Sequence, residues 1–222
     1  MLYFDQLIQS ATGYVSLIPF VCGILILNRA SATVKLLTFL IGLALLTEHL
    51  SILLANQGTN NLFLFHLYPS AELIVYLFIY RVHFTERHIP RTLLIIGLAF
   101  VFLSIINSLF IQKIDEFNTY GRSIESLILS ILSITFLIIN IQKWKGNSNQ
   151  GQAIFWINTG ALLYFPLNLV FFVMSNFLLK NYSNTFHNSL WTFHALLSFT
   201  QYFLFTIAIY TEWKRTKSPV LS

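Results

Sequence analysis

Four ionisable side chains stand in one apolar hairpin of the chain, between residues 47 and 80. They are Glu48, His49, His66 and Glu72, and a short polar turn at residues 55–61 separates the first pair from the second. Ionisable groups are costly in hydrocarbon, so in membrane proteins they usually face a bundle interior or a wet cavity and mark a functional site. A carboxyl group there must be protonated or paired. The hairpin therefore predicts a site without naming its ligand.

A second polar pattern lies near the C-terminus. His187, Trp191, His194, Ser198 and Gln201 follow one another in steps of four, three, four and three. Residues at this spacing share one face of a helix. Together with the hairpin and the polar surroundings of Pro166, the stripe gives the residues that we expect to bind a small ligand or a lipid headgroup: Glu48, His66, Glu72, His194, Gln201 and Asn168.

A metal ion is an alternative occupant of the same site. The side chains that could ligate it are Glu48, His49, His66, Glu72 and His194. Zinc held by histidine and carboxylate would lower the pKa of a bound water to about 7. We expect no lysine or arginine to be buried beside these groups, which leaves one another, a proton, a metal or a cationic ligand as their partners. Glu125 is expected at the membrane interface, in contact with headgroup water.

The composition is that of an integral membrane protein. Charged residues make up 9% and hydrophobic residues 56% of the 222 positions, whereas soluble domains carry about 25% charged residues. The lipid bilayer is therefore the first partner that we expect. The net charge of +5 does not indicate nucleic acid, because the cations lie in loops and do not cluster on one amphipathic face.

Seven stretches are long and apolar enough to span a membrane, which takes about 20 residues each. They lie at residues 11–27, 33–55, 62–80, 92–111, 120–141, 153–178 and 188–210. The first is short unless it extends back towards Leu2. Residues 1–222 are thus predicted to form a single all-α domain, a bundle of seven transmembrane helices.

The distribution of cations predicts the orientation of this bundle. One set of loops holds ten lysines and arginines, and the other holds only Lys113, Arg122 and Lys180. Short loops rich in cations face the cytoplasm. We therefore expect a multi-pass protein of the inner cell membrane with its N-terminus outside and its C-terminus in the cytoplasm, where the basic loops could contact a partner protein.

Several short motifs resemble a family of short, uncharacterised bacterial membrane proteins with seven helices. They are Thr47-Glu48, Asn60-Asn61, Glu72, the pair Trp191 and His194, and the closing LFTIAIYTEWKR. The resemblance covers most of the chain. It implies the same topology and a site made of Glu48, Glu72 and His194, and it implies no activity.

Comparison with families of known chemistry narrows the choice of function. Residues 188–210 contain no lysine, which excludes the retinal Schiff base of microbial rhodopsins. Three functions remain open, so the sequence does not say whether the chain is an enzyme. The first is a receptor or sensor with an outward-facing Glu/His pocket. The second is a membrane-embedded, metal-dependent hydrolase that acts on lipid, and the third is a proton-coupled transporter.

Overall fold

The computed structural model describes residues 2–84, 88–146, 152–181 and 183–217, and within these ranges the regular structure is helical. The helices are α1 (Leu2–Ile26), α2 (Ala32–Asn56), α3 (Leu64–Arg81), α4 (Ile89–Ile106) with the short π-helix η1 (Asn107–Ile111), α5 (Thr119–Gly146), α6 (Gln152–Asn181) and α7 (Asn184–Lys217). Each of the seven predicted stretches coincides with one α-helix, and η1 continues α4. The first helix does begin at Leu2.

Local sequence explains where these helices begin and end. Gly58, just after α2, has a φ of +68°, and the Thr59 amide returns to the Leu54 carbonyl at 2.9 Å, which is how a glycine terminates a helix. The hairpin turn between α2 and α3 is therefore fixed by its own residues. At the start of α4, proline occupies the first turn, where its missing N–H costs nothing.

Five helical segments of the described chain are long and apolar enough to cross a membrane. They are Ala32–Asn56, Ile89–Ile111, Thr119–Asn140, Ala153–Ser175 and Asn188–Lys217. Ala11–Ile26 is a shorter apolar helix. Large apolar side chains cover the outside of the bundle, for example Leu94, Ile95, Leu98 and Phe102 on α4. Such a surface suits lipid and would be a liability in water.

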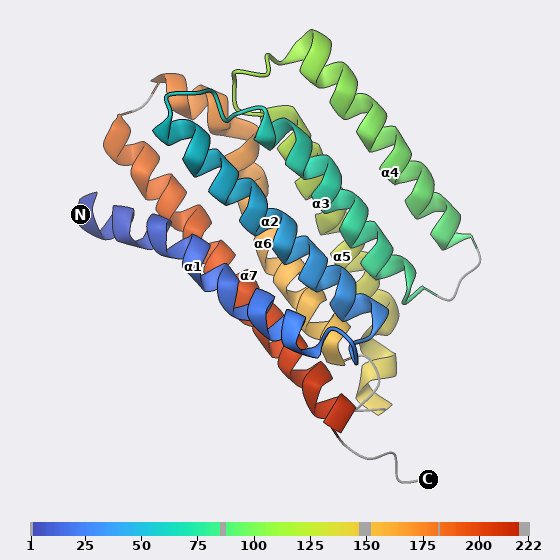
Figure 1. Cartoon of the computed structure of the whole chain (residues 1–222). Helices are drawn as coiled ribbons and strands as arrows, with labels where there is room; N and C mark the ends of the chain where they lie inside the picture. The colour runs from blue at the N-terminus through green and yellow to red at the C-terminus, as the bar shows by residue number, and fades with distance from the viewer. Residues whose placement is uncertain (1, 85–87, 147–151, 182, 218–222) are drawn as a thin grey trace.

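Six of the helices form a closed ring in the order α1, α2, α3, α5, α6, α7, each packed on the next, and α7 packs back on α1. The seventh, α4, packs on α3 from outside the ring (Figure 1). The ring interior is filled by buried aromatic and branched side chains, among them Tyr76, Tyr80, Phe136 and Phe165. The ring is what brings polar residues from distant parts of the sequence together.

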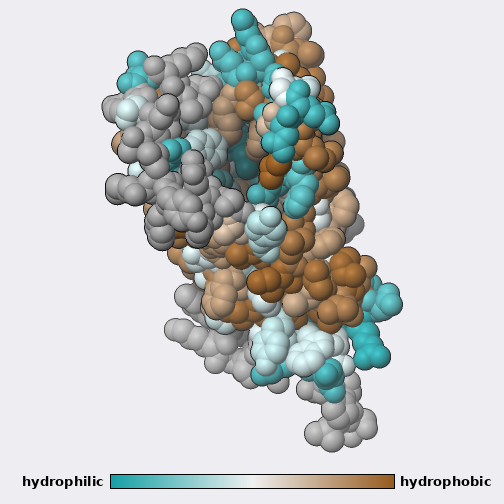
Figure 2. All heavy atoms as spheres, turned by 60° about the vertical axis from the view of Figure 1, so that its left-hand side comes forward, coloured by the Kyte–Doolittle hydropathy of each residue, from teal (hydrophilic) through white to brown (hydrophobic). Residues whose placement is uncertain are grey.

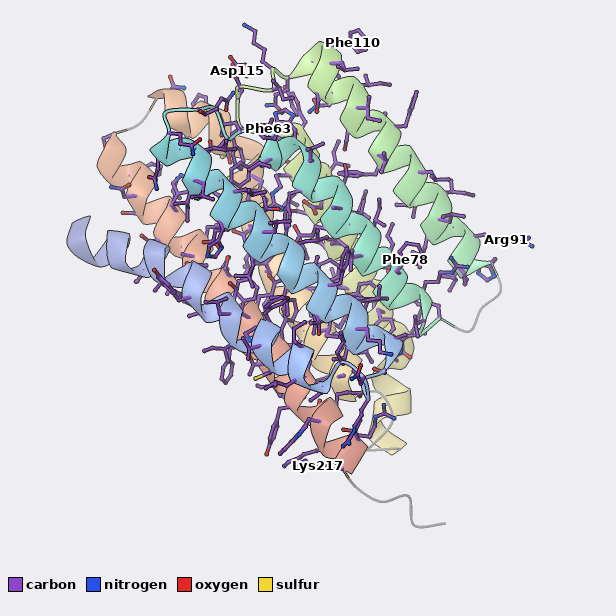
Figure 3. The ribbon with its side chains drawn as sticks, viewed as in Figure 1. Phe63, Phe78, Arg91, Phe110, Asp115 and Lys217 are labelled. Atoms are coloured by element: carbon purple, nitrogen blue, oxygen red, sulfur yellow. The ribbon has the colours of Figure 1, made fainter. Side chains whose placement is uncertain are left out.

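The two ends of the bundle differ in their loops. The N-terminal end, as we name it, carries the start of α1 and the α2–α3, η1–α5 and α6–α7 connections. The C-terminal end carries the α1–α2, α3–α4 and α5–α6 connections and the end of α7. In Figure 3, Phe63 and Asp115 lie towards the N-terminal end and Arg91 and Lys217 towards the C-terminal end.

Candidate functional site

A cavity of about 370 Å³ opens at the N-terminal end and is lined by all six helices of the ring. Its charged and amide side chains are Glu48, Glu72, Arg122, His194 and Gln201. Figure 2 shows the surface hollowed near this end, with hydrophilic residues inside the hollow. Glu48, Glu72, His194 and Gln201, which the sequence analysis expects in a ligand site, thus line one cavity.

Arg122 lines the cavity, where the sequence analysis expected no buried arginine. Its Nη1 donates to Glu72 Oε2 at 2.7 Å and to Glu125 Oε2 at 2.9 Å. The side chains of Arg122, Glu72 and Glu125 are 8%, 7% and 0% exposed. The expectation that no arginine is buried beside the acids is therefore wrong, and so is the expectation that Glu125 lies in headgroup water.

Aromatic rings hold the guanidinium of Arg122 from two sides. Its Cζ lies 5.2 Å from the centre of the Tyr68 ring and 5.1 Å from that of Phe172. A guanidinium attracts the negative face of an aromatic ring, and more so away from water. Within the described residues Arg122 Nε and Glu125 Oε1 are buried without a hydrogen-bond partner. The trio thus sets one positive charge against two carboxyl groups, and its hydrogen bonding is not fully satisfied.

His194 is oriented by a residue behind the cavity wall. Asn168 donates from Nδ2 to the Tyr164 carbonyl at 2.9 Å, and its Oδ1 lies 2.9 Å from His194 Nδ1. Because an amide oxygen can only accept, the proton of a neutral His194 sits on Nδ1 and Nε2 keeps a lone pair. Asn168 therefore positions the predicted imidazole and does not itself line the cavity.

Gln201 is fixed by a tyrosine from another helix. Its Nε2 donates to Tyr76 Oη at 3.1 Å, and the residue is 6% exposed. One of the two N–H groups of the amide is used by this bond, which leaves the other N–H as a donor and the amide oxygen as an acceptor. Trp191, His194, Ser198 and Gln201 all line the cavity, which confirms that part of the α7 stripe. The side chain of His187 lies outside the described residues.

Glu48 stands apart from the arginine. It is half-buried on α2 near its C-terminal end, and α1 passes close to it at Gly13. A Cβ at Gly13 would lie 2.9 Å from Glu48 Oε1, so a side chain at this position of α1 would displace the carboxylate. His49, one position further on, is exposed, and its Nδ1 contacts the Leu45 carbonyl at 2.8 Å. As expected from a rotation of about 100° per residue, only one of the two faces the cavity.

His66 is not part of the cavity wall, although it is buried on the same helix as Glu72. Its Nδ1 lies 2.9 Å from Ser108 Oγ and its Nε2 lies 3.1 Å from the Glu116 carbonyl. Six residues turn a helix by about 240°, which points His66 towards η1 and the η1–α5 connection. Its evident role is to tie these segments to α3.

Of the five predicted metal ligands, Glu48, Glu72 and His194 line the cavity, and His49 and His66 do not. Among the described residues no group of three or more His, Cys, Asp or Glu side chains is arranged to hold a metal ion. His49 and His66 face away from the cavity, as described above. The geometry therefore gives the prediction of a zinc site no support.

Several wall residues went unrecognised in the sequence. Among the aromatic rings of the cavity wall, Trp191 was expected from the α7 stripe, whereas Phe65, Tyr68 and Tyr202 were not. Phe65, Tyr68 and Glu72 are three and four positions apart, which is the spacing of one helix face. Arg122 and Glu125 are three apart on α5. That spacing was available as a signal for the ion pair, but an arginine near a predicted helix end is ordinarily solvated.

Comparison of the chain with models of known protein families, with curated proteins and with solved structures finds no match.

Proposed function

We propose that this chain is a multi-pass protein of the bacterial inner membrane, with seven spans, that binds a small ligand in the cavity at its N-terminal end and acts as a receptor or sensor. The observation that carries the proposal is the cavity itself. Its volume of about 370 Å³ falls at the small end of the range of ligand pockets, about 300–1,000 Å³. A few convergent polar groups set among aromatic rings are also typical of such pockets.

The orientation in this proposal rests on charge. Five helical segments have the length and composition of membrane spans. Of the ten lysines and arginines in one set of loops, the nine within the described residues fall at the C-terminal end. By the positive-inside rule that end faces the cytoplasm. The cavity then opens to the outside, and the basic loops are free to contact a cytoplasmic partner protein.

Cysteine labelling tests the position of the cavity. Cys22 is the one cysteine of the chain, so a Cys22→Ser background gives a clean start. On it, Asp115→Cys marks the exposed N-terminal end, Lys217→Cys the C-terminal end, and Ser198→Cys the cavity wall. Intact cells treated with an impermeant thiol reagent should label Asp115→Cys and Ser198→Cys, and Lys217→Cys only after permeabilisation. An unreactive Ser198→Cys beside a reactive Asp115→Cys would overturn the open cavity.

Binding is tested with the purified protein in lipid nanodiscs. The panel consists of inorganic cations, amines, carboxylates, sugars and lipid headgroups, and two readouts are taken together: the thermal unfolding midpoint and the alkylation rate of Ser198→Cys. A ligand that binds the folded state raises the midpoint by mass action. At least one compound should raise it and also slow the alkylation. If no member of the panel does both, the binding function is refuted.

The buried trio favours proton-coupled transport as a second candidate function. Glu72 and Glu125 share one nitrogen of Arg122, and carboxyl groups of this kind inside a membrane serve as proton relays in transporters. In proteoliposomes, a proton flux driven by substrate and lost in Glu72→Gln would support transport. A flux that is absent in the parent protein as well would leave binding as the function.

A further inference from the structure

Four side chains of the cavity wall, His194, Gln201, Glu72 and Glu48, keep a hydrogen-bond acceptor beyond the bonds described above. Nδ1 of His194 is engaged with Asn168, which leaves Nε2. One N–H of Gln201 Nε2 is engaged with Tyr76, which leaves the second N–H and the amide oxygen. Oε2 of Glu72 is engaged with Arg122, which leaves Oε1. The Glu48 carboxylate adds two oxygens, and acceptors of this kind select a ligand that carries N–H or O–H donors.

The charge of the cavity points the same way. Arg122 carries one positive charge against the two carboxylates that it contacts. With both ionised the trio has a net charge of −1, and with one proton shared between them its charge is zero. In neither state is it positive. Glu48 lines the same cavity, and an ionised Glu48 makes the whole site negative, which favours a cation.

The aromatic wall adds a third argument. Trp191, Tyr202, Tyr164, Tyr68 and Phe65 line the cavity, and aromatic faces attract organic cations. The guanidinium of Arg122 already stacks against Tyr68 and Phe172. Trp191 and Tyr202, on α7, are not part of that stack and add ring surface to the cavity wall. A ligand with an apolar body and a charged head therefore fits the wall.

We propose that the cavity binds a protonated organic amine that keeps its N–H groups, with Glu48 as counter-ion, His194 and Gln201 as hydrogen-bond acceptors, and the aromatic wall around the apolar body. The proposal rests on the binding function put forward above and names the ligand class of that site. An amine that carries N–H groups is favoured over a quaternary one. A quaternary amine donates no hydrogen bond, so the acceptors of the cavity would stay buried without a partner, which costs free energy.

Four probes on one carbon skeleton separate these contributions. They are 2-phenylethylamine, its N,N,N-trimethyl analogue, the neutral 2-phenylethanol and the anionic 3-phenylpropionate. Each is titrated into the purified full-length protein in nanodiscs, with affinity measured by calorimetry. A hydrogen bond to a charged group contributes about 1.5–3 kcal/mol, so the amine should bind at least about tenfold more tightly than the alcohol. The trimethyl analogue should lie between them, and the carboxylate should not bind.

Glu48→Gln should reduce amine affinity by about tenfold or more, because it removes the counter-ion and keeps the shape. Asp115→Asn is the matched control, since Asp115 is an exposed acid at the same end of the bundle. It should leave affinity unchanged. Both variants are first shown to keep the parent's unfolding midpoint in the absence of probe.

Three results would overturn the amine assignment: equal affinity for amine and alcohol, tighter binding of the carboxylate, or an amine affinity that Glu48→Gln leaves intact. In each of these cases a reactive and ligand-protected Ser198→Cys would still support a binding cavity. Failure of the amine assignment and failure of the proposed function are thus told apart.

Discussion

Two ion pairs with the same helical spacing sit at opposite ends of this bundle. Arg122 and Glu125 are three residues apart on α5, and so are Glu212 and Arg215 on α7. The first arginine is 8% exposed, and the second is 57% exposed. The pair of Arg122 and Glu125 is buried with a second carboxylate and, within the described chain, leaves two polar atoms without a hydrogen-bond partner. The pair of Glu212 and Arg215 is open to solvent through its arginine.

The pair at the C-terminal end has a structural explanation. Glu212 accepts from Nη2 and Nε of Arg215 at 2.7 and 3.1 Å. It also accepts from the Ser31 amide at 2.7 Å, at the residue that precedes α2. A carboxylate at a helix N-terminus satisfies a free N–H and complements the helix dipole. All of its contacts stabilise the fold.

The pair at the N-terminal end has no such explanation. Neither Glu72 nor Glu125 caps a helix, and replacing a buried ion network with apolar residues is often neutral or stabilising. A stability role alone therefore does not account for the trio, whereas a role in a polar cavity does. Four comparisons of variants, taken from the largest expected effect to the smallest, sharpen this difference.

Arg122→Met should have the largest effect. It leaves Glu72 and Glu125 buried without their cation, and removing one member of a buried ion pair costs about 3–5 kcal/mol. The free energy of unfolding in detergent, from denaturant titration, measures the loss. The triple variant Arg122→Met, Glu72→Gln, Glu125→Gln should recover most of it. If Arg122→Met is as stable as the parent, the trio is not a closed ion network.

Asn168→Leu should have the second largest effect. It removes the acceptor of His194 Nδ1, and leaving a buried donor unsatisfied costs about 1–3 kcal/mol. Amine affinity should fall as well, because the imidazole loses its fixed orientation. Asn181→Leu is the control: its Nδ2 bonds the Phe177 carbonyl within its own helix and it is exposed. Equal losses in the two variants would argue against a positioning role for Asn168.

Glu212→Ala should cost about 1–2 kcal/mol, the usual range for a lost helix cap. Arg215→Met should cost less than about 1 kcal/mol, because an exposed ion pair contributes little. The comparison uses unfolding midpoints at low and high salt, and only the smaller effect should fade as salt rises. A larger loss in Arg215→Met would mean that the pair, and not the cap, stabilises this end.

His83 should produce the smallest effect, and one that depends on pH. Burial lowers the pKa of His83 below its ordinary value of 6.5, and its Nε2 lies 2.8 Å from Thr33 Oγ1. The unfolded state then binds more protons, so this contribution to stability is present above pH 6.5 and is lost as the pH falls below it. His83→Asn should flatten the acid side of the stability profile. An unchanged profile would contradict this.

The helices could be predicted from the sequence because a membrane span leaves a long apolar signature. α2, for example, differs from its predicted stretch by a single residue at each end. The position of α4 outside the ring could not be predicted, although it agrees with the apolar character of that helix, most of which is not buried in the bundle. Which helices touch depends on packing, and hydropathy along the chain carries no information about it.

The candidate site was predicted in part. The α7 stripe gave His194 and Gln201 because helical spacing alone decides which residues share a face. The burial of Arg122 was not predicted, because it depends on α3 and α5 being neighbours in the ring. That packing places Glu72 opposite Arg122. His66 was wrongly expected in the site. It lies on the same helix as Glu72, as predicted, but the six positions that separate them rotate it to another face of that helix.

The most direct test of the proposed negative charge of the cavity compares two thiol reagents of similar size on Ser198→Cys in the Cys22→Ser background. The cationic reagent is 2-aminoethyl methanethiosulfonate, and the anionic one is 2-sulfonatoethyl methanethiosulfonate. The cation should react faster with Ser198→Cys than the anion, after correction for their rates with a free thiol, and Glu48→Gln should remove most of the difference. Equal rates, or a faster anion, would contradict the account.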